Sequence, residues 1–409
     1  MIRRLCAYGR LCLVSAWVAT SAAGQALTER QALQLLRESP YFVELQARVE
    51  VTRAERRRDT VYPNPSAVGW AEGAGQTNFF TVEQPLALNG RLRLLRQAGE
   101  SAVAATQAQG DYELRQIEAL VRLAFGELVY AQERKSAITA SMAELEDLVR
   151  ILREREDAGE GSKFDRLRAE REIIERRSEL DGVETSIAQA RARLAGFLGQ
   201  RIAPEGLVAK GTLDRTASPP EVMGAMQSAL MTRGDYRSQE AALQTLETEA
   251  QAADRRRIPN PVVLAGLKRA QVGSANRYAN GPVVSVSVDL PLFNKGQAER
   301  RLAEAEAARV RARRSILETQ ILADVRGAHQ TLLLRLAAAD RYERSSQQRA
   351  EELRAIAEIA YREGELGILE LIDSFRVAQQ AQLRLLELKA AARMAQIELD
   401  RAMGAEVTP

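Results

Sequence analysis

The sequence has very few of the cysteines and histidines that build many metal and redox sites. Among 409 residues there are two cysteines and one histidine, and both cysteines, Cys6 and Cys12, lie within the first 26 residues. A chain that loses this segment has no cysteine, which excludes disulfides and cysteine-based metal sites. His329 is the lone histidine, so no metal site with standard ligand spacing is expected. A nucleophilic triad and a phosphate-binding loop are also missing, and Asn294-Lys295-Gly296 indicates a turn. These absences argue against an enzyme and against a bound cofactor.

Aromatic residues and prolines are scarce as well. Aromatic residues make up 5% of the chain, against 28% for charged residues. Alanine, leucine, arginine, glutamate and glutamine dominate, a mix that favours long helices over a compact globular core. The composition predicts a mainly α protein with a small β part.

The first 26 residues have the pattern of a secretory signal peptide. A short apolar core, Leu11–Ala19, is preceded by the basic residues Arg3, Arg4 and Arg10. Small residues at 21–23 or 24–26 offer a cleavage site. The apolar run is too short to span a bilayer, which disfavours a membrane anchor. Removing three basic and no acidic residues takes the net charge from +3 to zero, which leaves no argument for nucleic-acid binding.

The rest of the chain follows one plan twice. Each half has two strand-like runs around a turn and then a long helical run without proline. The helical runs, 91–157 and 297–363, are both 67 residues long. Glycine-bounded stretches with identical spacing follow, from Gly159 to Gly199 and from Gly364 to Gly404. Matching order, length and breaks predict a duplicated fold.

The repeats set the expected organisation. The predicted parts are a signal peptide (1–26), a first repeat (27–199, with a hairpin at about 63–88), a linker in an equatorial region (200–220), a second repeat (221–404, with a hairpin at about 259–292) and a tail (405–409).

The strand-like runs are long enough to cross a membrane. Val283–Leu290 alternates valine or leucine with serine or aspartate, as expected for a strand with one apolar and one polar face. Runs of about 7 to 11 residues can cross a bilayer at a tilt. Four strands leave two unpaired edges that lipid cannot satisfy, so several copies must close one barrel. A small soluble sheet capping a coiled-coil rod is the alternative.

The helices must pack along their whole length. A helix of 67 residues is about 100 Å long at 1.5 Å per residue. Its apolar seam has heptad spacing at Leu114, Ile117, Val121, Ala124 and Leu128. The shorter helices, 41–58 and 162–199, nearly match its length if they stack end to end. These lengths predict a tube walled by alternating long and stacked helices, with a solid coiled-coil bundle as the alternative.

The chain resembles the TolC-type outer-membrane factors of tripartite efflux systems over essentially its whole mature length. The motifs that carry the resemblance are Leu27-Thr28 with Gln31-Ala32-Leu33, Pro-Asn-Pro at 63–65 and 259–261, Gln84-Pro85-Leu86 before Asn89-Gly90-Arg91, Arg233-Gly234-Asp235-Tyr236, Tyr361 with Gly364, and Glu370-Leu371-Ile372-Asp373. The Gln-Pro-Leu and Gly-Arg elements are similar to the cation-efflux (CzcC-like) branch.

The resemblance implies a duplicated coiled-coil α-barrel whose four β-strands join a trimeric, twelve-stranded transmembrane β-barrel. The implied location is the outer membrane of a Gram-negative bacterium, with a long periplasmic extension. The implied function is a passive exit duct without enzymatic activity or cofactor. Its implied partners are two further copies of the chain, outer-membrane lipid, a periplasmic adaptor and an inner-membrane pump of the resistance-nodulation-division class.

The cargo implied by the branch is heavy-metal cations. Two alternatives stay open at this point. One is the same duct in multidrug efflux or type I protein secretion. The other, of a different class, is a periplasmic coiled-coil scaffold without a pore.

The resemblance also implies roles for residues at the two helix breaks. Glu370 and Asp373 match acidic residues that narrow the periplasmic tip in the family, and three copies bring six carboxylates together. Two ordinary acids favourable to a helix dipole are the alternative. Asp165 and Tyr361 match residues that hold the tip closed, whereas Leu366 replaces a basic residue of that closing network.

Two arginine clusters precede the strand entries, at Arg56-Arg57-Arg58 and Arg255-Arg256-Arg257. We expect both clusters to ring the periplasmic base of the barrel and to meet anionic lipid headgroups. The alternative is a small electrostatic benefit at helix C-termini.

Overall fold

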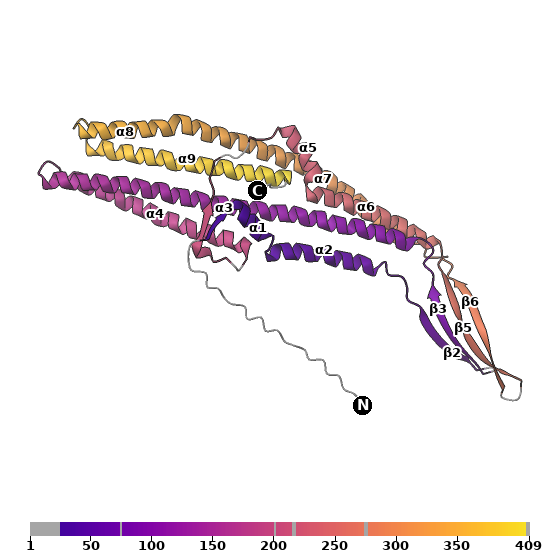
Figure 1. The fold of residues 1–409 in the computed structure, drawn as a ribbon. Helices are drawn as coiled ribbons and strands as arrows, with labels where there is room; N and C mark the ends of the chain where they lie inside the picture. Colours follow the sequence, from indigo (N-terminus) through magenta and orange to yellow (C-terminus); the bar gives the residue numbers. More distant parts are fainter. Residues whose placement is uncertain (1–24, 74–75, 200–201, 215–217, 274–276, 406–409) are drawn as a thin grey trace, which may run out of the picture.

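The computed structural model describes residues 25–73, 76–199, 202–214, 218–273 and 277–405. The predicted signal peptide (1–26) and tail (405–409) therefore lie outside the described residues, apart from Gln25, Ala26 and Ala405. The molecule is long and narrow, with helices over most of its length and a small sheet at one end (Figure 1). Within the described ranges, no helix combines the length and apolar character needed to cross a membrane.

Two long helical rods organise the fold. The first rod is α3 (Arg91–Asp157), and the second consists of α7 (Gln297–Tyr342), a π-helical turn (Glu343–Gln347) and α8 (Gln348–Arg362). The other helical segments are α1 (Glu29–Leu36), α2 (Pro40–Arg58), α4 (Lys163–Leu198), η1 (Pro204–Gly206), α5 (Val222–Thr232), α6 (Gly234–Asp254), η2 (Arg255–Arg257) and α9 (Ile368–Met403). The rods coincide with the two proline-free runs. The π turn has no counterpart in the first rod, and the sequence pattern did not reveal it.

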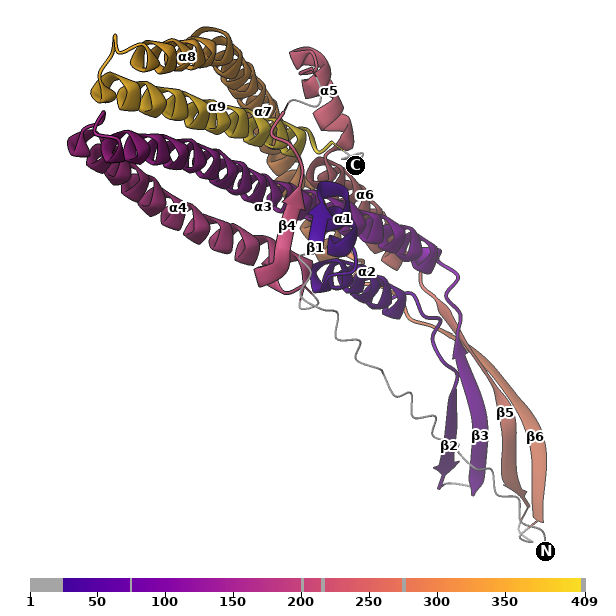
Figure 2. The ribbon, with the colours of Figure 1, turned by 60° about the vertical axis from the view of Figure 1, so that its left-hand side comes forward.

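The shorter helices stack end to end along the rods, as predicted from their lengths. The start of α2 meets the end of α4, where the rings of Tyr41 and Phe197 lie with their centroids 6.4 Å apart. In the second half, α6 starts where α9 ends, and the Thr232 hydroxyl donates to the Met403 carbonyl at 2.9 Å. Figures 1 and 2 show α2 and α4 along one side of α3.

Pro40 begins a new helix and does not lie inside one. Helix α1 ends at Leu36, and Pro40 is the first residue of α2. Proline suits that position because the first turn of a helix leaves its N–H groups unpaired in any case.

Both rods end in the same backbone motif. Gly159 and Gly364 adopt φ angles of 76° and 79°. One residue further on, the Glu160 N–H donates to the Arg155 carbonyl and the Glu365 N–H to the Ala360 carbonyl, both at 2.9 Å. This pattern is a Schellman motif, which needs a left-handed residue that glycine supplies without strain. The matched glycines in the sequence therefore mark two equivalent reversals of the chain.

The strands form one antiparallel sheet with two free edges. Its members are β2 (Ser66–Glu72), β3 (Thr77–Pro85), β5 (Pro261–Val272) and β6 (Arg277–Val288), in the order β2-β3-β5-β6. Each strand connects to a helix in the same order, because β2 follows α2, β3 precedes α3, β5 follows α6 and β6 precedes α7. The helices α2, α3, α6 and α7 therefore lie side by side in the same order as the strands β2, β3, β5 and β6. Strands β2 and β6 are at the edges of the sheet.

The sheet is strongly coiled around Gly266. A Cβ atom at this position would lie 2.1 Å from the Phe80 carbonyl oxygen and 2.6 Å from the Thr81 Cα. By contrast, a Cβ at Gly69 would have no atom closer than 3.9 Å. A glycine in a strand often marks a bend or a close approach of two backbones, and here it lets β5 wrap closely against β3.

A small second sheet lies halfway along the helices. Strands β1 (Gln25–Thr28) and β4 (Leu207–Lys210) pair in parallel. A capping box begins α1, since the Gln31 N–H donates to Thr28 Oγ1 and the Thr28 N–H donates to Gln31 Oε1. The Gln132 side chain of α3 bonds both the N–H and the carbonyl of Ala209. This equatorial region is therefore fastened to the first rod.

Candidate functional site

The four helices at the end farthest from the strands share one apolar cluster. Leu152 of α3, Ala169 of α4, Ala357 of α8 and Leu371 of α9 are all buried in it. Leu366, in the turn between α8 and α9, packs against the same cluster. An apolar residue at this position thus holds the turn by burial.

Asp165 and Tyr361 come together at this tip. Asp165 lies in the first turn of α4, and Tyr361 lies in the last turn of α8. Burial raises the pKa of Tyr361, and the nearby Asp165 charge raises it further, whereas Arg155 of α3 acts in the opposite direction. The phenol therefore stays protonated at neutral pH. The Tyr361 phenol of the second helical hairpin thus interacts electrostatically with Asp165 and Arg155 of the first.

Glu370 and Asp373 lie on the exposed side of the first turns of α9. Both side chains face away from the cluster that buries Leu371 and Ile372. One turn further on, the negative charge of Asp373 contributes to raising the pKa of Arg376. The two carboxylates are thus free to face solvent or another copy of the chain.

A buried carboxylate clasps α4 to α9 above these acids. Glu172 accepts from Arg376 Nη2 at 2.7 Å and from Arg176 Nη2 at 2.5 Å. Burial acts to raise the pKa of Glu172, but the two guanidinium groups outweigh it and hold the pKa below its usual value. The bond to Arg176 is shielded from water, which strengthens a charge-assisted contact, whereas Arg376 is partly exposed.

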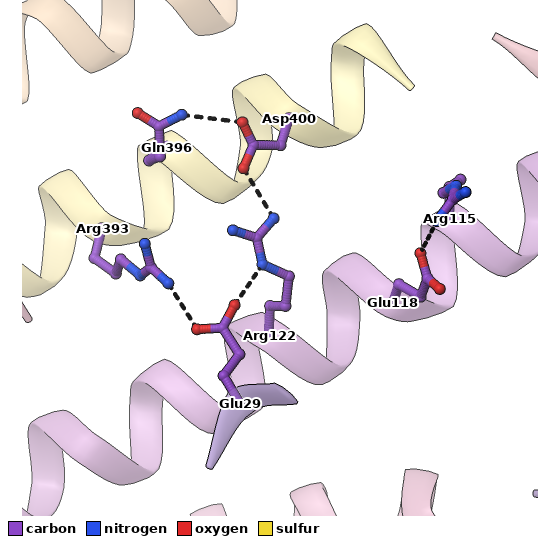
Figure 3. A network of polar contacts seen from close by, with 7 residues as sticks. All are labelled: Glu29, Arg115, Glu118, Arg122, Arg393, Gln396 and Asp400. Carbon is purple, nitrogen blue, oxygen red and sulfur yellow. Dashed lines mark hydrogen bonds and ion pairs between the residues drawn. The ribbon is translucent and has the colours of Figure 1, made fainter. Parts of the chain in front are cut away.

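A second charged network lies at the equator (Figure 3). Arg122 of α3, almost fully buried, donates to Glu29 of α1 at 2.7 Å and to Asp400 of α9 at 2.9 Å. Arg393 donates to the other oxygen of Glu29 at 2.6 Å. Burial alone would lower the pKa of Arg122, but the charges of Glu29 and Asp400 raise it, so this side chain stays ionised. The network ties the N-terminal helix to both halves of the fold.

The arginine clusters lie where helices give way to strands, and several of them are bonded within the chain. Arg56 pairs with Glu249 of α6 at 2.6 Å, and Arg256 pairs with Glu299 of α7 at 2.6 Å. The weaker pairs are Arg257 with Asp254 and Arg58 with Asp59. Within the described part of the chain, the side chains of Arg57 and Arg255 are exposed and form no ion pair.

Metal-binding chemistry is not evident in the described ranges. They contain no group of three or more histidine, cysteine, aspartate or glutamate side chains that could hold a metal ion. The His329 Nε2 atom lies 2.9 Å from the Pro220 carbonyl oxygen, so a backbone contact accounts for this residue.

No protein-family model matches the chain. Among curated proteins, it is 25% identical to the cobalt-zinc-cadmium resistance protein CzcC of Cupriavidus metallidurans, over 92% of this chain and 90% of CzcC. It is 23% identical to the pyoverdine export outer membrane protein OpmQ of Pseudomonas aeruginosa, over 94% of this chain and 81% of OpmQ. It is also 26% identical to the nickel and cobalt resistance protein CnrC of C. metallidurans, over 70% of this chain and 65% of CnrC.

Solved structures share the fold over nearly the whole length. The outer-membrane channel OprN superposes with a TM-score of 0.69 at 20% identity, covering 93% of this chain and 91% of OprN. The outer membrane protein VceC of Vibrio cholerae gives a TM-score of 0.68 at 18% identity, covering 92% of this chain and 96% of VceC.

The chain has the fold of the TolC-like outer membrane factors.

The structure places the four predicted tip residues at the end farthest from the strands, and their roles stay predictions. The structure brings Asp165 and Tyr361 together and leaves Glu370 and Asp373 exposed on one helix. The Glu172 clasp and the Arg122 network were missed. Arg376, which bonds Glu172, is 204 residues away from it, and Asp400, which bonds Arg122, is 278 residues away from it. No local sequence pattern indicates such pairs.

The Glu172 clasp predicts a pH-dependent contribution to stability. Glu172→Gln should lower the free energy of unfolding at pH 7 by about 1–3 kcal/mol, because two guanidinium groups lose their anion. The folded pKa of Glu172 lies below the unfolded value of about 4.3. Its contribution is therefore complete above pH ~4.3 and is lost as the pH falls through the folded pKa.

The measurement is thermal unfolding of the detergent-solubilised protein, followed by circular dichroism at pH 7 and at stepwise lower pH. Asp147→Asn is the matched control, because its pair with Arg150 is exposed and should contribute nothing measurable. A difference between wild type and Glu172→Gln that persists unchanged below pH 3 would contradict the role given to this carboxylate.

Proposed function

We propose that this protein is the outer-membrane exit duct of a tripartite efflux system. The observation that carries the proposal is the four-stranded sheet with free edges at β2 and β6, continuous with a layer of helices in the same order. A curved layer of this kind closes into a tube only when further copies are added. The named relatives are resistance and export proteins, which supports an efflux role.

Three copies would close the tube edge to edge. Strand β6 of one copy would pair with β2 of the next, and the α7–α8 rod would pack against the α2–α4 side of its neighbour. Both sides carry exposed apolar side chains, which are Leu302, Ile316, Leu334, Leu353, Ile356 and Ile359 on the rod and Val43, Val51 and Ile174 on the other side. Apolar side chains along both edges of a helical layer favour burial between copies. A periplasmic scaffold without a pore does not explain the strands with an exposed apolar face.

The proposed cargo is heavy-metal cations, delivered by a pump of the resistance-nodulation-division class through a periplasmic adaptor. Two of the three relatives named above are metal-resistance proteins, and the third exports pyoverdine. Export of a small organic molecule is therefore the second candidate. Sensitivity of a deletion strain to cobalt, zinc and cadmium separates the two.

The proposed gate is the tip around Glu370 and Asp373. Three copies would place six carboxylates around a narrow opening, where confined water screens them poorly. The pore should then prefer cations, and multivalent cations should block it from the tip side. Replacing both residues with alanine should raise the half-blocking concentration of a trivalent cation at least tenfold, about 1.4 kcal/mol.

The measurement is the reversal potential and cation block in a planar bilayer under a salt gradient. Glu363→Ala with Glu365→Ala is the control, because these exposed carboxylates lie in the adjoining turn and off that face of α9. Identical ion selectivity and identical cation block in wild type and the Glu370/Asp373 variant would show that these residues do not line the constriction. Failure of the wild type to conduct would reject the duct itself.

Lipid contact at the base of the barrel is proposed for Arg57 and Arg255 in particular, because the other arginines of the clusters have partners within the chain. Each unpaired arginine near an anionic surface contributes about 1 kcal/mol of attraction. Arg57→Gln with Arg255→Gln should lower the amount of anionic phospholipid that copurifies with the protein. The control removes equal charge away from the strands, with Arg313→Gln and Arg335→Gln in α7. Equal phospholipid content in both variants would leave only a local role for the clusters.

A further inference from the structure

The strand register divides the sheet into two chemically different faces. On one face, a band of small and aliphatic side chains crosses all four strands, formed by Ala67, Gly69, Phe80, Val82, Ala265, Leu267, Val284 and Val286. Phe80, Val82, Leu267, Val284 and Val286 are all exposed in the single chain. An exposed apolar band is the side of a transmembrane strand that faces lipid.

The opposite face carries the polar groups. Thr81, Glu83, Lys268, Ser285 and Ser287 all lie on it, although Val68, Val262, Leu264 and Val283 interrupt the polar pattern. In the closed barrel of the proposed function, this face lines the channel.

One row on this polar face is unusual. Trp70, Phe79, Lys268 and Gly281 are neighbours in register across β2, β3, β5 and β6. The rings of Trp70 and Phe79 stack with their centroids 3.7 Å apart and their planes within 8° of parallel. Lys268 is exposed and forms no ion pair with the described residues, and its chain extends over Gly281, which has no side chain to oppose it. A flat aromatic surface and an unpaired ammonium group thus lie in one row.

The position of this row along the membrane normal can be inferred from the residues on the apolar face. The adjoining row on the apolar side contains Asn78, Arg269 and Asn280, which ends the apolar band. The Arg269 guanidinium lies over the Tyr278 ring, 4.7 Å from its centroid. Polar and aromatic residues of this kind mark the membrane–water interface of transmembrane strands. Because the strands point away from the helices (Figure 2), this interface is the outer one.

We propose that Trp70, Phe79 and Lys268, repeated in each copy, form a ring inside the outer mouth of the channel that binds planar aromatic anions. The proposal rests on the shared barrel of the proposed function. Stacking on an aromatic side chain accepts any flat π system, and Lys268 attracts the negative charge. An aliphatic anion cannot stack on the aromatic rings, and an aromatic cation is not attracted by the Lys268 ammonium group. The ring adds a binding property to the exit and is independent of the carboxylates at the tip.

The chain offers a direct reporter of this site. It has two tryptophans, and the other one, Trp17, lies in the predicted signal peptide. Fluorescence of the mature protein therefore comes from Trp70 alone. In reconstituted protein, acrylamide in water should quench this emission, and brominated lipid should not. A Trp70→Phe/Phe80→Trp variant moves the single tryptophan to the apolar face and should reverse both results.

The binding probe is 4-nitrobenzoate, with cyclohexanecarboxylate as the saturated anion and 4-nitrobenzylamine as the aromatic cation. 4-Nitrobenzoate added on the outer side should quench Trp70 saturably and block the single-channel current over the same concentration range. Phe79→Leu should raise the half-saturating concentration about tenfold. Lys268→Gln should raise it for 4-nitrobenzoate and abolish the preference over 4-nitrobenzylamine.

Matched controls lie one residue away on the opposite face. Like Phe79→Leu and Lys268→Gln, the substitutions Phe80→Leu and Arg269→Gln remove one aromatic ring and one positive charge, and both should leave binding unchanged. Quenching of Trp70 by brominated lipid, or an effect of Phe80→Leu equal to that of Phe79→Leu, overturns the proposal. If Trp70 binds 4-nitrobenzoate but the wild type passes no current, the duct function fails and the ring stands. If current flows and 4-nitrobenzoate neither quenches nor blocks, the ring alone fails.

Discussion

Two unpaired strand edges are the constraint on which the rest of the structure depends. Strands β2 and β6 each present a row of backbone N–H and C=O groups that pair with no other strand of the described residues. In a membrane such groups cost several kcal/mol each unless another strand satisfies them. In the proposed transmembrane barrel, a single chain therefore leaves its strand edges unsatisfied. The helical layer has the same order and the same open sides, so the proposed closure by further copies would satisfy both layers at once.

The duplicated plan explains how one chain builds matching pieces of sheet and tube. Each repeat supplies a hairpin and a rod, and each rod ends in a Schellman motif at a glycine. The two repeats are nevertheless not identical. The π turn at Glu343–Gln347 interrupts only the second rod. Within this turn, Glu343 forms an ion pair with Lys389 of α9, with an N–O distance of 3.0 Å. The Arg122 network joins the repeats at the equator, so the halves behave as one body there.

Much of the fold follows from local patterns in the sequence. The absence of proline over residues 91–157 delimits α3, and the alternation of Phe80 and Val82 with Phe79 and Thr81 assigns the faces of β3. Long-range pairing was beyond such patterns. The stacking of Trp70 on Phe79 depends on the hairpin register, and the contacts of Glu172 and Arg122 depend on how distant helices pack. The π turn differs from an α-helix in its backbone hydrogen bonds, which span five residues and not four. The spacing of apolar residues in the sequence does not indicate this change. Tip residues were found through family resemblance, and their roles remain proposals.

The most direct test of the account is the mass of the folded protein in mild detergent. The free edges of the sheet predict a particle with three copies of the mature chain, which dissociates only when the β-structure is lost. Mass photometry or light scattering with detergent correction gives the mass, and circular dichroism reports the strands in the same sample. A mass of three chains supports the shared barrel. A stable single chain that keeps its β-structure would contradict it.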